Sequence, residues 1–188
     1  SMALLEFTDK GLYCPVGDFF IDPWRPVSRA VITHAHSDHA RSGHGSYLCH
    51  NLTTPLLQLR LGAHAYQSVK WKENVYINGV KISLHPAGHI IGSSQVRLEY
   101  DGEVWVVSGD YKTENDGISE AFEPVSCDTF ITESTFGLPV YRWQPQKQLF
   151  STLQDWVLCN QQQGICSVIF AYSLGKSQRV IKAVSEVT

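Results

Sequence analysis

The sequence contains no apolar run approaching the roughly 18 consecutive residues that a membrane-spanning helix requires. Its first residues also lack the basic-then-apolar layout of a secretory signal. Lysine and arginine form no dense run and the formal net charge is −3, so the composition excludes a generic polyanion binder. The five cysteines are scattered and form no CxxC pair, which favours reduced thiols over a disulfide framework. We therefore expect a cytoplasmic protein with no membrane partner.

The composition is that of a folded protein with room for more than one unit. The 188 residues suffice for one domain and part of a second, with 43% hydrophobic and 18% charged residues. Near the C-terminus, a helix over residues 146–163, a strand over 167–171 and a helix over 176–184 predict a parallel α/β unit. Because the chain stops within the last helical pattern, we expect this second domain to be truncated.

Short strands and turns dominate the earlier part of the chain. Asn78-Gly79 and Asp101-Gly102 each separate two strand-like runs, which predicts two hairpins around type I′ turns. A helix is predicted over residues 53–61, with Gly62 as its end. The other expected strands cover residues 4–7, 11–14, 19–21, 30–33 and 129–132.

The most informative feature is a cluster of four potential metal ligands within six residues: His34, His36, Asp38 and His39. The cluster follows the apolar run 30–33, so it occupies the loop after a buried strand, where functional sites are common. In an extended backbone His34 and His36 point to the same side and converge on one ion. Imidazole and carboxylate suit zinc and similar divalent ions.

Two further strand ends carry matching chemistry. His89 and Asp110 each follow a predicted strand. Three imidazoles around one ion would leave a fourth position open to water, as expected of a catalytic zinc site. The predicted ligand sets are His34, His36 and His89 for one ion, and Asp38, His39 and the bridging Asp110 for the second.

Such an ion pair, about 3.5–4 Å apart, lowers the pKa of a shared water from about 15.7 toward about 7. The resulting hydroxide can attack a phosphorus atom or a carbonyl carbon, so the ligand cluster alone does not choose the substrate.

These motifs together resemble the metallo-β-lactamase superfamily, and the later ones resemble its β-CASP nuclease branch. Within that branch the similarity to bacterial ligase-associated DNA exonucleases spans nearly the whole chain. The segments that carry the resemblance are residues 11–15, 21–26, 34–39, 88–89, 109–110, 132–137, 139–143 and 170–178. The resemblance implies an α/β fold: an αββα sandwich over residues 1–138, followed over 139–188 by the beginning of an incomplete β-CASP parallel α/β domain.

The resemblance also implies roles for single residues. Asp22 matches an aspartate that holds the histidine loop by hydrogen bonds, and the six predicted ligands match the family's ligands. Asp38, Asp110 and Glu133 are the expected catalytic residues, Glu133 matching an acid that lies beside a proton-donating histidine. The family places that histidine and one more ligand farther along a longer chain, whereas no histidine follows Asp110 here. We therefore expect the second metal to bind weakly or to be missing.

Several other residues have weaker claims. His44, His50, His64 and His85 are expected on the surface or behind the ligands, with His85 the best candidate to support them. Residues 174–177 lack the full spacing of a phosphate-binding loop. Aromatic residues flanked by arginine are candidates for a rim that contacts the substrate. The rim candidates are Trp24, Arg25, Arg142 and Trp143.

We expect a metal-dependent exonuclease that hydrolyses DNA in repair, with two divalent ions, zinc or else manganese, and a functional link to a DNA ligase. A ribonuclease is the first alternative. Hydrolysis of a small thioester or lactam, and a chain that binds metal without catalysis, also remain open.

Overall fold

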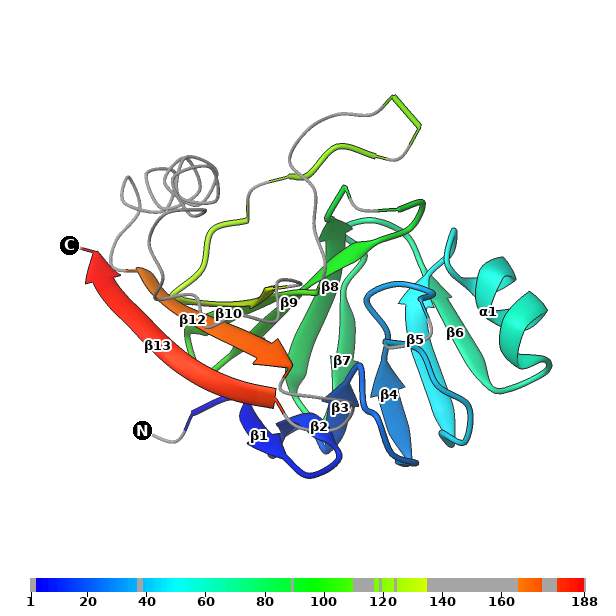
Figure 1. Ribbon diagram of the computed structural model, residues 1–188, viewed down its shortest axis with the longest axis horizontal. Coiled ribbons are helices and arrows are strands. Elements are labelled where there is room, and N and C mark those ends of the chain that lie inside the picture. Colours follow the sequence, from blue (N-terminus) through cyan, green and yellow to red (C-terminus); the bar gives the residue numbers. More distant parts are fainter. Residues whose placement is uncertain are drawn as a thin grey trace.

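Two β-sheets face each other in the described part of the chain (Figure 1). The computed structural model describes residues 3–36, 39–88, 90–109, 117–118, 120–123, 125–134, 166–173 and 179–187, with the backbone alone for 132–134, 166–173 and 179–187. No helix among these residues is long and apolar enough to cross a membrane.

The first sheet has the order β1-β2-β3-β4-β5-β6. Its first three strands pair antiparallel, whereas β3 to β6 pair parallel. Parallel pairing brings the carboxyl ends of β3, β4 and β5 to one edge. The strands are β1 (Glu6–Thr8), β2 (Gly11–Cys14), β3 (Phe19–Ile21), β4 (Arg29–Val31), β5 (Ser46–His50) and β6 (Tyr66–Val69).

The second sheet has the order β13-β12-β11-β10-β9-β8-β7. Its antiparallel β7–β8 and β9–β10 hairpins turn at Asn78-Gly79 and Asp101-Gly102, and all four of these residues have positive φ. This backbone is the one that a type I′ turn needs, so both predicted hairpins are confirmed. The strands are β7 (Val75–Ile77), β8 (Val80–Pro86), β9 (Ser94–Tyr100), β10 (Glu103–Ser108), β11 (Thr129–Ser134), β12 (Cys166–Ser173) and β13 (Arg179–Val187).

The main core fills the space between the sheets. It joins Ile21, Val31 and Leu48 of the first sheet to alternate residues of the second, including Leu84 and Val96. The predicted helix is present as α1 (Thr54–Leu61), and it packs on the outer face of the first sheet (Figure 1) through Leu57, Ala30 and Tyr47. Two facing sheets with a helix outside one of them agree with the expected sandwich.

The predicted helix over residues 176–184 is wrong. Of these residues, the structure describes 179–184, and they belong to β13, which pairs antiparallel with β12, Ile181 lying opposite Ala171. The segment is rich in β-branched residues, Val180, Ile181 and Val184, which favour strands. The helix expected over 146–163 lies outside the described residues. Strand β12 pairs parallel with β11, and the domain division after residue 138 stays a prediction.

Candidate metal centre

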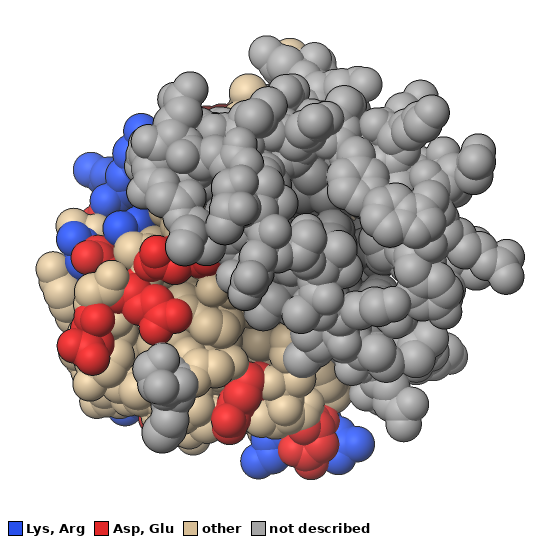
Figure 2. Space-filling model, turned by 90° about the vertical axis from the view of Figure 1, so that its left-hand side faces the viewer, with Lys and Arg blue, Asp and Glu red and all other residues tan. Residues whose placement is uncertain are grey.

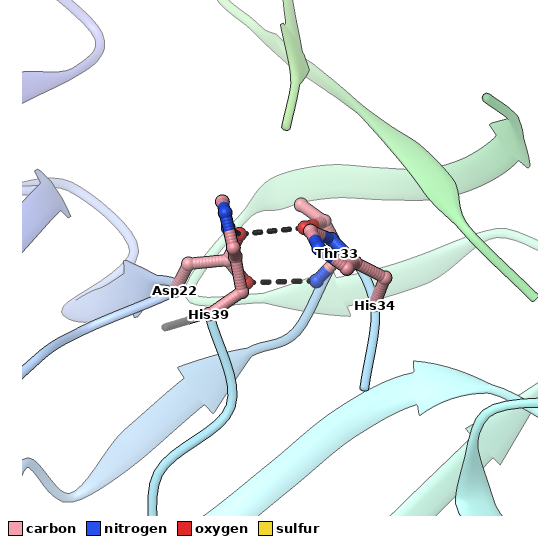
Figure 3. A network of polar contacts seen from close by, with 4 residues as sticks. All are labelled: Asp22, Thr33, His34 and His39. Carbon is pink, nitrogen blue, oxygen red and sulfur yellow. Dashed lines mark hydrogen bonds and ion pairs between the residues drawn. The ribbon is translucent and has the colours of Figure 1, made fainter. Parts of the chain in front are cut away.

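A buried carboxylate organises the loop that follows β4 (Figure 3). Asp22 Oδ1 accepts a hydrogen bond from the Thr33 backbone N–H at 2.8 Å. Its Oδ2 accepts from the Thr33 hydroxyl at 2.6 Å and from His39 Nδ1 at 2.8 Å. Asp22 directly follows β3, and its backbone N–H donates to the Val31 carbonyl oxygen. Pairing of β3 with β4 therefore places this carboxylate beside the loop.

The network sets which ring nitrogens carry protons. Asp22 is an acceptor only, so the Thr33 hydroxyl and His39 Nδ1 must both donate to it. Since the Thr33 hydroxyl has a single proton, its oxygen can only accept from His34 Nδ1, which lies 2.9 Å away. In the neutral rings of His34 and His39, the lone pair is then on Nε2, the atom that binds a metal when Nδ1 contacts a carboxylate or another oxygen.

Burial distinguishes this cluster from polar side chains that lie near one another by chance on a surface. Asp22, His34 and His39 are only 3%, 0% and 2% exposed. Burial alone would raise the pKa of Asp22, but the His39 hydrogen bond, the positive charge that His39 and His34 carry when protonated, and the Thr33 bond together lower that pKa. The carboxylate therefore stays ionised.

The donor chemistry fits a divalent cation. One potential ligand atom from each of Asp22, His34 and His39 lies within 4.8 Å of the others. The His34 ring lies 4.1 Å from that of His39 and 5.0 Å from that of His36, centroid to centroid. A turn in which His39 N–H donates to the His36 carbonyl oxygen brings these residues together. Because three hydrogen bonds already use the Asp22 oxygens, the imidazoles are the better ligands.

The second sheet also reaches this network. The Thr33 carbonyl oxygen accepts from the backbone N–H of Ser94 at 2.8 Å, at the start of β9. Gly109, which follows β10, approaches so closely that a Cβ there would lie 2.6 Å from Thr33 Oγ1. Thr33 therefore contacts segments of both sheets.

A row of buried polar side chains crosses the outer face of the second sheet. Gln95 on β9 is paired in register with His85 on β8 and with Ser108 on β10. Three atoms of this row, His85 Nδ1, Gln95 Oε1 and Ser108 Oγ, have no hydrogen-bond partner within the part of the chain that the structure describes. Gln95 Nε2 donates to the carbonyl oxygens of Pro86 at 2.9 Å and Glu123 at 2.6 Å, so it ties the end of β8 to the 120–123 segment.

The structure groups some of the predicted site residues and describes others only in part. Asp22, His34, His36 and His39 lie together, whereas His85 is outside their cluster and contacts Ser83 Oγ at 2.9 Å. The Trp24 indole N–H donates to the Asp9 carbonyl oxygen, and Arg25 lies 3.9 Å from the Asp9 carboxylate. Glu133 is in β11, described by its backbone alone. Asp38, His89, Asp110, Arg142 and Trp143 lie outside the described residues.

Sequence reasoning missed two residues of this region. Thr33 was assigned to the apolar run before the histidines, although a hydroxyl at the end of a buried strand could have marked it as a partner for them. Gln95 alternates with apolar residues along its strand, a pattern typical of a solvent-exposed face, yet it is fully buried.

Among curated proteins, the chain is similar to a probable DNA ligase of Opitutus terrae, 33% identical over 183 residues that make up 94% of this chain and 18% of that protein. It is 29% identical over 124 residues to cleavage and polyadenylation specificity factor subunit 3 of Dictyostelium discoideum, covering 64% of this chain and 16% of that protein. An RNase J-like protein of Methanocaldococcus jannaschii is 27% identical over 127 residues, 63% of this chain and 30% of that protein. The chain thus spans less than a third of each relative.

Among solved structures, the chain is similar to that of the CmlA beta-hydroxylase E377D mutant, with a TM-score of 0.57 over 84% of this chain and 44% of that chain. At 12% identity this likeness concerns the fold alone. No family model matches the chain.

Proposed function

Since the chain belongs to the metallo-β-lactamase superfamily, in its β-CASP nuclease branch, we propose that it is part of a metal-dependent exonuclease that hydrolyses DNA in repair. We place it in the cytoplasm and assign it two divalent ions, zinc or else manganese. The hydrogen-bond network of Asp22 is the observation that carries the proposal.

The network supports metal binding because a charged carboxylate is buried in order to orient two adjacent imidazoles. A buried carboxylate that accepts three hydrogen bonds fixes the rings of His34 and His39 with the Nε2 lone pairs available for a cation. A purely structural role would need no such tautomer. In the proposal His36, Asp38, His89 and Asp110 complete the ligand set.

Bound divalent ions would supply positive charge near a phosphodiester and lower the pKa of a neighbouring water. Asp22 and Thr33 hold the histidine rings, and Gly109 leads into the bridging Asp110. We assign Glu133 the task of orienting a proton donor for the leaving oxygen, a role in which a carboxylate raises the pKa of an imidazole. We assign His85 of β8, four residues before His89, a supporting role behind the ligands.

DNA is the favoured polymer because the similarity to the relative named for DNA ligation extends over 94% of this chain. That same relative motivates a functional link to a ligase. RNA is the second candidate, since the relatives named for RNA processing match 63–64% of the chain.

The test is digestion of matched, end-labelled DNA and RNA strands, single and double, by the chain with zinc or manganese. DNA shortened stepwise from an end is the expected result, and RNA degraded in its place would establish the alternative. Asp110→Asn should abolish cleavage, whereas Asp101→Asn, in an exposed hairpin turn, should not. Metal binding without cleavage of either polymer would contradict the nuclease proposal for this chain, and turnover of a thioester or lactam would replace it.

A further inference from the structure

A groove of about 540 Å³ lies on the outer face of the first sheet, along β2 and β3. This volume is within the range of about 300–1,000 Å³ found for small-molecule sites. Lys10 and Asp18 line its two ends, and Arg29 lines the side formed by the start of β4. The metal-centre proposal makes no use of these residues.

Two aromatic rings form the floor of the groove. Tyr13 of β2 and Phe20 of β3 are paired in register, and their ring centroids are 4.5 Å apart. Their strand neighbours Leu12 and Ile21 point into the core between the sheets, so these rings lie on the opposite, outer face. Both rings are half-buried and present an apolar platform.

The wall opposite the platform is held by backbone contacts. The Gly45 N–H donates to the Val27 carbonyl oxygen at 2.9 Å. A Cβ at Gly45 would lie 2.6 Å from the Ser28 carbonyl oxygen, so only glycine allows this approach. The shape of this wall is therefore set by the backbone as well as by side chains.

The charges of the groove suit an anion attached to a polar ring. Lys10 and Arg29 are exposed, and no carboxylate among the described residues forms an ion pair with either. Asp18 accepts a hydrogen bond from the Tyr13 hydroxyl at 2.9 Å and keeps an oxygen for a further donor. Figure 2 shows another face, where basic side chains gather at the upper left and acidic side chains lie below them.

The groove leads toward the edge that carries the histidines. Phe20 is two residues before Asp22, about 7 Å along the strand. At the Lys10 end, the Lys10 carbonyl oxygen accepts from the backbone N–H of Trp24 at 2.9 Å, which joins this end to the segment after Asp22. A ligand along the groove would thus approach the metal centre from the side of the first sheet.

We propose that this groove binds a single-stranded segment of nucleic acid, with a base on the Tyr13–Phe20 platform and phosphates at Lys10 and Arg29. Asp18 accepts from amino groups on the base edge. This inference rests on the proposed function and adds a substrate contact away from the metals. Stacking on aromatic rings tolerates any base, so the contact gives affinity with little sequence preference.

The test is the fluorescence anisotropy of a labelled oligodeoxycytidylate, whose bases carry an amino group, with the full chain, in chelator so that no cleavage occurs. Lys10→Glu should weaken binding about tenfold and make its salt dependence shallower, because a phosphate contact is lost. Phe20→Leu should weaken binding about tenfold with the salt dependence unchanged, since one stacked base is lost. Lys70→Glu, an equal charge reversal at the end of β6, is the control and should bind like the parent.

Circular dichroism and thermal unfolding of each variant separate loss of contact from loss of fold. Parent-like binding by folded Lys10→Glu and Phe20→Leu, in a chain that still cleaves nucleic acid, would overturn the groove proposal and leave the nuclease intact. A parent that neither binds nor cleaves any nucleic acid would overturn both. Equal displacement of the oligonucleotide by polyglutamate would show a general anion site and would also overturn the base-stacking proposal.

Discussion

Gly109 lies against Thr33 so closely that a methyl group at residue 109 would be 2.6 Å from the Thr33 hydroxyl oxygen. The end of β10 is thereby locked onto the residue that links Asp22 to His34. The contact joins the two sheets at the candidate metal centre. It leaves no space for a side chain at residue 109, so glycine is required there.

Gly109→Ala should therefore lower the free energy of unfolding by about 1–3 kcal/mol through overpacking, and should also weaken metal binding. Urea unfolding and titration against a chromophoric chelator measure the two effects. Gly102→Ala is the matched control, because residue 102 has a positive φ but no atom within 4 Å of a new Cβ. It should cost stability through backbone strain and leave metal affinity unchanged. Equal metal affinities in both variants would refute the coupling.

Asp22→Asn should weaken zinc binding about 10- to 100-fold while the fold persists, because an amide has an NH2 donor in place of one carboxylate oxygen and cannot accept all three hydrogen bonds from Thr33 and His39. Competition with a chromophoric chelator measures the affinity. Asp18→Asn makes the same chemical change at an exposed residue of similar backbone conformation, φ 54° against 46° at Asp22. That control should bind zinc like the parent, and an unaltered affinity in Asp22→Asn would rule out the orienting role.

Gln95→Leu should lower the free energy of unfolding by about 1–3 kcal/mol, because the amide that joins Pro86 to Glu123 is lost from a buried position. Gln67→Leu, at an exposed position of β6, should change it by less than about 0.5 kcal/mol. Urea unfolding in chelator compares the two. Similar values for both variants would mean that the Gln95 contacts contribute nothing.

Acid should destabilise the fold through three buried histidines. Burial lowers the pKa of His44, His50 and His85 below the ordinary 6.5, and at His44 the charge of His64 adds to this effect. Between the lowered folded-state pKa and 6.5, the unfolded chain binds more protons. The free energy of unfolding is therefore expected to fall as the pH drops through 6.5 and to recover above it.

Urea unfolding in chelator at several pH values from about 5.5 to 7.5 checks this slope. His50→Gln should reduce the slope, whatever it does to stability at neutral pH through the lost stacking on Trp71. Identical slopes in the parent and in this variant would exclude His50 from the effect.

Local patterns predicted the elements that depend on few residues. The two hairpins follow from Asn78-Gly79 and Asp101-Gly102, whose positive φ values fix the turn and the register together. The sequence does not predict strands β5 and β6, because their stability comes from parallel neighbours distant in sequence and β6 has mostly exposed side chains. At β13, the turn-then-helix pattern predicts a helix whereas the β-branched composition favours a strand, and pairing with β12 decides the outcome.

The same distinction applies to the candidate site. His34, His36 and His39 are near in sequence, so their spacing suffices to predict that they meet. The contact of Asp22 with Thr33 joins residues 11 apart and requires β3 to pair with β4. The row through Gln95 requires three strands in register, which no single stretch of sequence displays.

Thr33 also fixes the direction of the hydrogen bonds in the network, because its hydroxyl donates to Asp22 and accepts from His34. Valine has almost the same shape, but it has no proton to give to Asp22 and no oxygen to receive one from His34. The imidazole could then turn over or exchange its tautomer, and the nitrogen that meets a cation would no longer be fixed. The hydroxyl proton of Thr33 thus determines which nitrogen of the His34 ring carries the lone pair that faces a cation.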